Sequence, residues 1–544
     1  MMTSRLITIV VVPALCLSLF ACGKQKESKV AYGNKNQILY VNNGDEPEDL
    51  DPHITTGTPE SRLMFALFEG LTRKNAATLE PIPGVAESWE ISEDGKTYTF
   101  TIRDNARWSN GDPLTANDFV YSWRRILSPA FGSRYSYMLY HIKNAEQYHS
   151  AKITDFNQVG VKSPTPNTLV VELNNPAPFF LQLLDHHSYY PVHQATIEKF
   201  GDIDTYGTQW TRMGNFVGNG PFALAAWEIN KIVSVKRNPM YWDADAVKLN
   251  EIHFSPVVNL TTIERMFRSN QIHASLGTYI AIEKISWYKE NQPEKIHITP
   301  GYATYYYHYN VTRKPFDDVR VRRALAMAID RQKIIDKVTK GGQLPAYAFT
   351  PSDPNGYSPK AALEFNVEKA RQLLAEAGYP NGEGFPSFEL MYNTLENHRK
   401  IATAIQQMWK QNLNINTTLY NLEWKVYLKA RENLEHDVVR AGWLADFVDP
   451  SNFMDLMLSY SGNNHSAWKN KQYDELVETA MTMKSEQDRY ALYQQAEQIL
   501  IDDMPIIPIY FYSHIHLVQP SLQGWHDNIM SFFDFKNMSL TITE

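Results

Sequence analysis

The sequence predicts a large protein of mixed class, α/β or α+β, whose chain crosses several times between domains. Three observations predict this architecture. The chain has 544 residues, enough for roughly three to four domains of ordinary size. Strand-like and helix-like stretches alternate along it without a detectable internal repeat. No low-complexity linker divides the body, so independent domains joined like beads on a string are not expected.

The first 21 residues predict an export signal. An apolar run covers residues 6–21; Pro13 interrupts it, and it is too short to span a membrane comfortably. Its end resembles a bacterial lipobox, in which Cys22 receives lipid and becomes the mature N-terminus. The alternative is an ordinary secretory signal that is cleaved after Ala21. In both cases we expect export, with the protein anchored at the periplasmic face of a bacterial membrane, or soluble in the periplasm if no lipid is attached.

The cysteine count limits the chemistry of the folded body. Cys16 and Cys22 are the only cysteines in the sequence, and both lie at its start. A disulfide framework, a cysteine-based zinc site and a catalytic cysteine are therefore excluded for the folded body. Residues 22–35 are rich in Lys, Gln, Ser, Gly and Asn, which predicts a flexible tether. No later segment approaches about 18 uninterrupted apolar residues, so we expect no second membrane span.

The clearest strands carry apolar residues at every second position. Residues 97–102 alternate Tyr, Phe and Ile with threonine, which predicts a strand with one buried face. Residues 169–173 repeat the pattern with Leu, Val and Leu, after a turn rich in Pro, Ser and Asn. Both segments therefore predict strands.

Two helices carry clear start signals. Residues 367–377 show apolar spacing of three and four, with Asn366 as the N-cap and Gly378 as the stop. An earlier helix opens at residues 317–318, where two aspartates suit the positive end of a helix dipole. The apolar side of that helix consists of Leu325, Ala328 and Ile329.

Composition excludes two classes of protein. Hydrophobic residues make up 43% and charged residues 21%, an ordinary globular mixture that rules out wholesale disorder. The formal net charge of −8 lacks the basic footprint of a nucleic-acid-binding protein. The 31 Tyr, 25 Phe and 12 Trp predict aromatic-lined surfaces, because Tyr and Trp carry a polar group that seeks a partner.

Catalytic and metal-binding motifs are missing from the sequence. It contains no G-x-S-x-G elbow, no Walker phosphate loop and no H-E-x-x-H pair. The nearest metal-like groups are residues 185–187 (Asp-His-His) and the pair His514 and His516, too few ligands for an ordinary zinc site. We interpret them as surface or hydrogen-bonded histidines. A nonlocal triad stays open, but we expect neither an enzyme nor a cofactor.

A set of motifs spread along the chain carries a family resemblance. They are Leu50-Asp51-Pro52-His53, Leu67-Phe68-Glu69-Gly70-Leu71, Pro83-Gly84-Val85-Ala86-Glu87-Ser88-Trp89, the stretch from Tyr98 to Trp123, Asn238-Pro239-Met240-Tyr241-Trp242, Asp318-Val319-Arg320-Val321-Arg322 and Arg440-Ala441-Gly442-Trp443-Leu444-Ala445-Asp446. From Leu39 to near the C-terminus the chain resembles the oligopeptide-binding proteins of bacterial ABC importers, solute-binding protein family 5.

The resemblance implies an α/β fold of two lobes that close on a ligand around a hinge, built from three domains. The implied first domain comprises residues 36–68, 194–303 and 514–544. The second, residues 69–193, is an insertion in the same lobe, and the third, residues 304–513, forms the other lobe. We expect a monomer.

The resemblance also implies how a peptide is held. Its α-amine would pair with Asp446, because an unpaired buried ion is costly. Gly442 would bring its backbone close to the peptide, and Trp443 would form an aromatic wall. Pocket-lining positions fall on Trp424, Leu428 and Tyr512, and Tyr137 matches a tyrosine at the amine end. For each of the aromatic residues among them, ordinary core packing is the alternative. The peptide carboxylate would meet Arg440, Arg431 or His398 according to ligand length, with surface ion pairing as the alternative.

The sequence departs from the family pattern at four positions. A disulfide of many relatives is missing, with Ala303 and Leu444 in its place, so we expect packing alone to hold the binding loop. His308 replaces an acidic residue, and Thr56, close to Thr58, replaces another. These losses of negative charge favour neutral or apolar peptides over basic ones.

The function implied is a receptor that captures oligopeptides and delivers them to the ABC permease in the membrane. The alternative is the same scaffold with another ligand, such as murein peptide, dipeptide or haem. An exported chaperone or adhesin is a third class. No nucleic-acid partner is expected.

Overall fold

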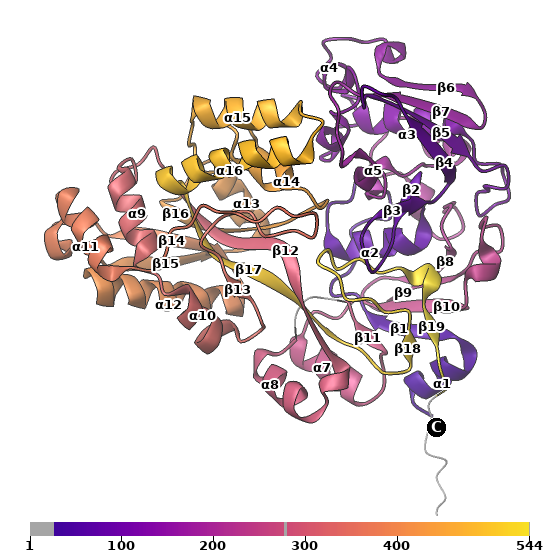
Figure 1. The fold of residues 1–544 in the computed structure, drawn as a ribbon. Helices are drawn as coiled ribbons and strands as arrows, with labels where there is room; N and C mark the ends of the chain where they lie inside the picture. The colour runs from indigo at the N-terminus through magenta and orange to yellow at the C-terminus, as the bar shows by residue number, and fades with distance from the viewer. Residues whose placement is uncertain (1–26, 277–279, 543–544) are drawn as a thin grey trace, which may run out of the picture.

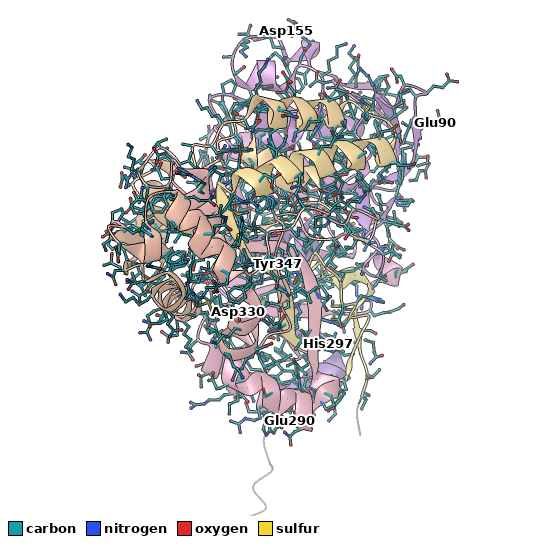
Figure 2. All side chains as sticks on the ribbon, turned by 60° about the vertical axis from the view of Figure 1, so that its left-hand side comes forward. Glu90, Asp155, Glu290, His297, Asp330 and Tyr347 are labelled. Carbon is teal, nitrogen blue, oxygen red and sulfur yellow. The ribbon has the colours of Figure 1, made fainter. Side chains whose placement is uncertain are left out.

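The structure, a computed structural model, describes residues 27–276 and 280–542 (Figure 1). It is a mixed α/β fold with two bodies beside each other. The first body holds strands β1 to β11 and the C-terminal strands, and the second holds the large sheet with helices α9 to α16. In the turned view of Figure 2, Glu90 and Asp155 mark one end of the molecule, and Glu290 and His297 mark the opposite end.

The first body is built on a five-stranded sheet of order β11-β1-β10-β9-β8. Its strands are β1 (Ile38–Asn42), β8 (Phe222–Glu228), β9 (Ile232–Arg237), β10 (Glu251–Ser255) and β11 (Ala274–Ser275). Its helices are α1 (Lys29–Asn36), α2 (Thr58–Leu67), α6 (Gln194–Phe200), α7 (Leu260–Arg268) and α8 (Ile282–Asn291). The C-terminal pair β18 (Leu522–Gln523) and β19 (Ser539–Leu540) returns to it, since Gln37 Nε2 donates to the carbonyl of Leu540 (2.6 Å).

A four-stranded antiparallel sheet of order β4-β5-β7-β6 forms the rest of the first body. The elements of this region are β2 (Thr72–Lys74), β3 (Pro81–Pro83), β4 (Ala86–Ile91), β5 (Thr97–Ile102), β6 (Val161–Thr165), β7 (Thr168–Glu172), α3 (Ala116–Leu127), α4 (Ala145–His149) and α5 (Phe180–Leu183). Both predicted strands are confirmed as β5 and β7. Tyr98, Phe100 and Ile102 are buried while Thr101 is exposed, because successive side chains of a strand face opposite sides.

The second body is built on a six-stranded sheet of order β13-β17-β12-β16-β14-β15. Its strands are β12 (Ile296–Tyr309), β13 (Leu344–Pro345), β14 (Phe388–Asn393), β15 (Thr417–Leu422), β16 (Val438–Leu444) and β17 (Ile506–Leu517). Its helices are α9 (Val319–Met327), α10 (Arg331–Ile334), α11 (Val367–Glu376), α12 (Glu396–Leu413), α13 (Trp424–Glu432), α14 (Ser451–Met454), α15 (Lys471–Met481) and α16 (Glu486–Asp503).

Both predicted helices are confirmed, with their caps. Asn366 Oδ1 accepts from the backbone N–H of Lys369 at the start of α11, and Gly378 follows its end with φ +99°. Asp318 caps α9 in the same way. Leu325, Ala328 and Ile329 are all fully buried, although α9 itself ends at Met327.

The long strands β12 and β17 connect the two bodies. They pair antiparallel from Ile296 opposite Leu517 to His308 opposite Ile506. One end of this pair packs on α7 and α8 of the first body, and the other end lies in the core of the second body. The pairing register shifts between Pro300 and Thr304, where the ladder passes from one body to the other. This irregularity provides a bend at the crossing.

The N-terminal helix corrects one expectation. We expected residues 22–35 to form a tether, but α1 begins at Lys29, and its Val30, Gly33 and Asn34 are buried against the first body. The polar composition of this segment did not indicate a helix, because α1 docks on the first body through only a few buried residues. The predicted signal and Cys22 lie outside the described residues. Within residues 27–276 and 280–542, no helix has the length and apolar character needed to cross a membrane. The residue boundaries of the three predicted domains stay a prediction.

Candidate functional site

Asp446 lies where the two bodies meet, two residues beyond the end of β16. Its side chain is 14% exposed, and burial raises its pKa to about 7 although the charge of Lys74 opposes the shift. Within the second body, its backbone N–H donates to Asn452 Oδ1 (3.4 Å). Across the junction, His186 Nε2 lies 4.0 Å from Asp446 Oδ1. This carboxyl group therefore changes its charge near neutral pH, at a surface that both bodies share.

The first body places aromatic rings opposite Asp446. The ring of Tyr135 lies 4.9 Å from that of His186 and 5.9 Å from that of Tyr137, measured between centroids. Burial, followed by the nearby charge of Asp446, raises the pKa of both tyrosines. Burial lowers the pKa of His186 well below its ordinary value, so this ring is neutral. The structure thus brings together the predicted residues Asp446 and Tyr137, and adds Lys74 and His186.

The histidine motifs that resemble metal sites have backbone partners instead. The Nδ1 atom of His187 lies 2.7 Å from a backbone carbonyl, and Nε2 of His514 and Nδ1 of His516 each lie 3.0 Å from another. Burial lowers the pKa of all three rings. These contacts support our interpretation of them as hydrogen-bonded histidines.

Hydrogen bonds hold the loop that carries Asp446. Trp443 Nε1 donates to Asn452 Oδ1 (2.7 Å), so the same amide contacts Trp443 and the backbone of Asp446. Ala445 N donates to a backbone carbonyl of β12 (3.0 Å). Ala303 stands directly opposite Leu444 in the β12–β16 ladder. The expectation that packing alone holds this loop was therefore incomplete, because three polar contacts replace the cross-link.

Arg440 and Tyr512 form a second polar group on one face of the sheet. Arg440 Nη2 donates to Tyr512 Oη (2.6 Å), Nη1 donates to Asn393 Oδ1 (3.3 Å), and the guanidinium lies 4.6 Å above the ring of Tyr305. A Cβ atom on Gly442 would lie 2.8 Å from Tyr512 Oη. The absence of a side chain at Gly442 therefore makes room for Tyr512, a role that the sequence analysis did not foresee.

His398 joins this group from α12. Its Nδ1 atom lies 3.3 Å from Tyr305 Oη, and burial together with the charge of Arg440 lowers its pKa to about 2. His398 is therefore neutral and serves as a hydrogen-bonding group, not as a cation. His398 and Tyr512 line a cavity of about 50 Å³ between the bodies. Its other lining residues include Ile280, Ile285, Gln343, Asn397 and Ser513.

The remaining predicted residues lie apart from these groups. His308 is fully buried on the opposite face of β12 from Tyr305, since the side chains of a strand alternate. Arg431 and Leu428 come from α13, which covers that face. Thr58 is exposed at the start of α2, and no interaction among the described residues joins its side chain to the others. The side chain of Trp424 lies outside the described set.

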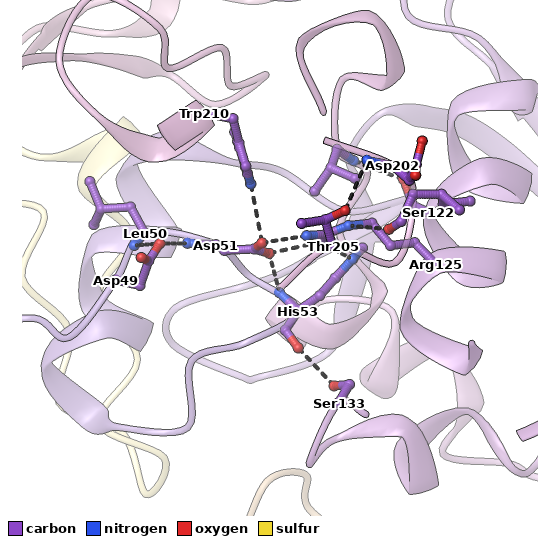
Figure 3. A network of polar contacts seen from close by, with 12 residues as sticks. Asp49, Leu50, Asp51, His53, Ser122, Arg125, Ser133, Asp202, Thr205 and Trp210 are labelled. Atoms are coloured by element: carbon purple, nitrogen blue, oxygen red, sulfur yellow. Dashed lines mark hydrogen bonds and ion pairs between the residues drawn. The ribbon is translucent and has the colours of Figure 1, made fainter. Parts of the chain in front are cut away.

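A buried ion pair fixes the wall of the first body (Figure 3). Arg125 of α3 donates to both carboxylate oxygens of Asp51, at 3.0 and 2.6 Å, and Trp210 Nε1 donates to the same carboxylate (3.2 Å). Burial opposes ionisation of Asp51, but Arg125 outweighs it, and the pKa lies below its ordinary value. Next to the pair, the backbone carbonyl of His53 accepts from Ser133 Oγ (2.7 Å). The motif at residues 50–53 thus anchors the loop against which His187 rests.

The two bodies touch beside Asp446. The rings of Phe179 and Phe447 stack with centroids 4.8 Å apart, and Val448 N donates to Gln182 Oε1 (3.1 Å). The structure therefore shows a closed arrangement around the carboxyl group.

Comparison with known proteins assigns this geometry to a family. A family model described as "Bacterial extracellular solute-binding proteins, family 5 Middle" matches residues 80–465. The chain belongs to this family. The fold of family 5 is two-lobed, so the two bodies are its lobes.

Relatives within family 5 cover almost the whole chain. The periplasmic oligopeptide-binding protein OppA of Salmonella typhimurium is 40% identical over 497 residues, 90% of either chain. The oligopeptide-binding protein OppA of Bacillus subtilis is 36% identical over 536 residues, 95% of this chain and 96% of the other. The solved complex of Haemophilus influenzae OppA with the peptide RPPGFSPFR is similar with a TM-score of 0.81 and 35% identity, covering 93% and 99% of the two chains. The murein tripeptide-binding protein MppA of Escherichia coli has a TM-score of 0.83 and 35% identity, covering 92% and 98%.

Proposed function

We propose that this chain is the substrate-binding component of an ABC-type oligopeptide importer, which captures extended peptides between its lobes. The observation that carries the proposal is the free edge of β16 that leads to Asp446. Strand β14 pairs with β16 only at Val438 and Val439, and no other described strand pairs with that edge of residues 441–444. An extended peptide can add to such an edge by main-chain hydrogen bonds, whatever its side chains.

The two ends of that edge differ in charge. Beyond its C-terminal end, Asp446 is a carboxyl group that becomes charged near neutral pH and suits the α-amine of a peptide. At its N-terminal end, Arg440 carries a charge that suits a carboxylate, with His398 and Tyr512 as neutral hydrogen-bonding groups. A peptide with free termini would therefore lie in one direction, with its amine towards Asp446.

A solved relative from Bacillus anthracis, described as the substrate-binding domain of an oligopeptide ABC transporter, supports delivery to a membrane permease. The relatives with the names OppA and MppA are binding proteins for oligopeptides and murein peptides, and the dipeptide-binding protein DppE of Bacillus subtilis is 34% identical. We infer a binding protein without catalytic activity, a monomer that works with ABC permease subunits outside the cytoplasm. A lipid anchor at Cys22 would keep it near that partner and raise its effective concentration. Mass measurement of the mature N-terminus, with Cys22→Ala as the comparison, tests the anchor.

Native mass spectrometry tests the proposed ligand class. The protein is purified from its own cells without denaturation, and the mass that it releases on unfolding is fragmented. We expect peptides of mixed sequence with unmodified amino termini. A single non-peptide compound would contradict the proposal, and a single dipeptide or murein peptide would narrow it to the alternative ligands.

A further inference from the structure

The cavity beside His398 and Tyr512 has walls from both lobes. Five isoleucines line it: Ile280 before α8, Ile282 and Ile285 within α8, Ile401 of α12 and Ile515 of β17. We call this space the isoleucine cavity. Since α8 belongs to the first lobe and α12 to the second, the cavity is complete only in the closed arrangement.

The isoleucine walls are the edges of two buried cores. Ile280, Ile285 and Ile515 are buried in the apolar cluster that packs around α7 and α8. Ile401 is buried in the main core of the second lobe. Side chains that are close-packed in a core cannot move inward to fill an adjacent space. The cavity therefore has a shape that the fold sets, and a ligand group has to fit it.

The polar side chains of the lining already have partners or reach solvent. Gln343 Oε1 accepts from Thr339 Oγ1 (2.9 Å) and from the backbone N–H of Gly341 (3.0 Å). Ser513 Oγ donates to the carbonyl of Gly341 (2.6 Å), and Asn397 is partly exposed. Among the residues that the structure describes, no Asp, Glu, Lys or Arg lines the cavity. It therefore offers a ligand an apolar surface, without a charged partner.

We propose that the isoleucine cavity binds an aliphatic side chain near the carboxyl end of the bound peptide. The inference rests on the proposed function, whose substrate class it narrows. The cavity adjoins Tyr512, and the hydroxyl of Tyr512 accepts from Arg440 (2.6 Å), at the end of the β16 edge that suits the peptide carboxylate. A side chain that leaves the peptide backbone next to Arg440 can therefore enter the cavity.

The volume of the cavity sets the size of that side chain. A space of about 10–15 Å³ on the same measure holds one water molecule, so about 50 Å³ holds about four atoms of that size. The side chains of Leu and Ile have this size, whereas those of Phe and Trp are larger. Leu395 also lines the cavity and is 42% exposed, which leaves apolar surface for such a group to cover. An aliphatic side chain in this place contacts both lobes and so stabilises the closed arrangement.

Titration calorimetry with a leucine scan tests the cavity. Alanine-based pentapeptides with free termini carry one Leu, moved from the first position to the last, and a matched series carries Asn, which has a similar branched shape but is polar. We expect Leu to bind at least about tenfold tighter than Asn at one of the last two positions, with a more negative heat-capacity change, because apolar surface is buried. Equal affinity of Leu and Asn at both positions overturns the role of the cavity and leaves peptide capture intact. If no peptide of either series binds, the proposed function fails, and the inference with it.

Variants assign the leucine preference to this cavity. Ile282→Asn and Leu395→Asn place an amide in the lining at positions that are only partly buried or exposed, and each should reduce the ratio of Leu to Asn affinity at least about threefold. Ile229→Asn, the same change at an isoleucine of the first lobe that is 73% exposed, should keep the ratio. If Ile282→Asn does not fold, as judged by circular dichroism, the more exposed Leu395 decides. A ratio that persists in the lining variants places the preference on another surface and overturns the proposal.

Discussion

At the scale of single residues, Asp446 has the environment that its proposed role requires. Burial of this carboxyl group costs desolvation when the lobes close. Its raised pKa expresses that cost, although Lys74 and Asn452 offset part of the shift. An ammonium group at this position would remove the cost, because it pairs with the ionised form. In this proposed role, Asp446 would couple closure to the presence of an amine.

The pH profile of peptide affinity tests this coupling. The amine stabilises ionised Asp446, so affinity falls by up to about tenfold per pH unit as the pH drops below the pKa of Asp446 in the peptide-free protein. That pKa is about 7 in the closed arrangement of the structure, and it is lower where the lobes open and water reaches the carboxyl group. Above about pH 8 the peptide amine loses its proton, and affinity falls again. For a neutral peptide we therefore expect an acid limb that begins at or below about pH 7 and an alkaline limb above about pH 8. Asp446→Asn should remove the acid limb, whereas Glu90→Gln, a charge change on the exposed surface, should leave it; an acid limb that persists in Asp446→Asn contradicts the assignment.

At the scale of elements, the β12–β16 ladder carries the binding loop without a cross-link. Ala303 and Leu444 are direct register partners, the arrangement in which two Cβ atoms come close enough for a disulfide. We expect the double variant Ala303→Cys and Leu444→Cys to oxidise spontaneously in a chain that starts after Cys22. The closed loop is long, so the free energy of unfolding should rise by about 2–4 kcal/mol. Denaturant unfolding with and without reductant measures this, and equal midpoints would show that the register differs.

The elements also show what local sequence can predict. Strands β5 and β7 and helices α9 and α11 were predictable because alternation and capping are properties of neighbouring residues. Helix α1 was missed because its few buried residues contact segments far along the chain, as where Val30 N donates to the carbonyl of Asn270 (3.0 Å). A polar composition alone cannot reveal such docking.

The residues of the candidate site also fall into a group that local sequence predicts and a group that it does not. The family motif at residues 440–446 predicted Asp446, Arg440 and Trp443 as site residues, because the motif is one continuous segment of the sequence. Lys74 and His186 come from the other lobe, and only the folded chain places them near Asp446. No local signal marks them, because their roles depend on burial and on a partner hundreds of residues away.

At the scale of the whole molecule, individual side-chain contacts join the two lobes at the edges of the surface over which they close. Phe179 stacks on Phe447, and Lys484 Nζ donates to the carbonyl of Glu93 (2.9 Å). Among the described strands, only β12 and β17 run through both lobes. Their pairing register shifts where they pass from one lobe to the other. This construction favours a rigid-body movement about the bend.

Small-angle X-ray scattering tests that movement. When no amine is bound, burying Asp446 costs desolvation free energy. We therefore expect the peptide-free protein to be more open in solution than the structure. Saturating peptide should reduce the radius of gyration to the value calculated from the structure. The variant Phe447→Ala, which removes the stacking contact, should weaken closure and affinity together. An identical radius with and without peptide, while calorimetry confirms binding, would favour a preformed pocket.

The most direct test of peptide capture compares a peptide of neutral side chains with the same peptide acetylated at its α-amine, by calorimetry at about pH 7.5. We expect acetylation to lower affinity at least about a hundredfold in the wild-type protein, the order expected when a buried ion loses its partner. In Asp446→Asn the two peptides should bind with similar, weak affinity, while Glu90→Gln should behave as wild type. Equal affinity of both peptides for the wild-type protein would contradict the claim that Asp446 anchors the peptide between the lobes.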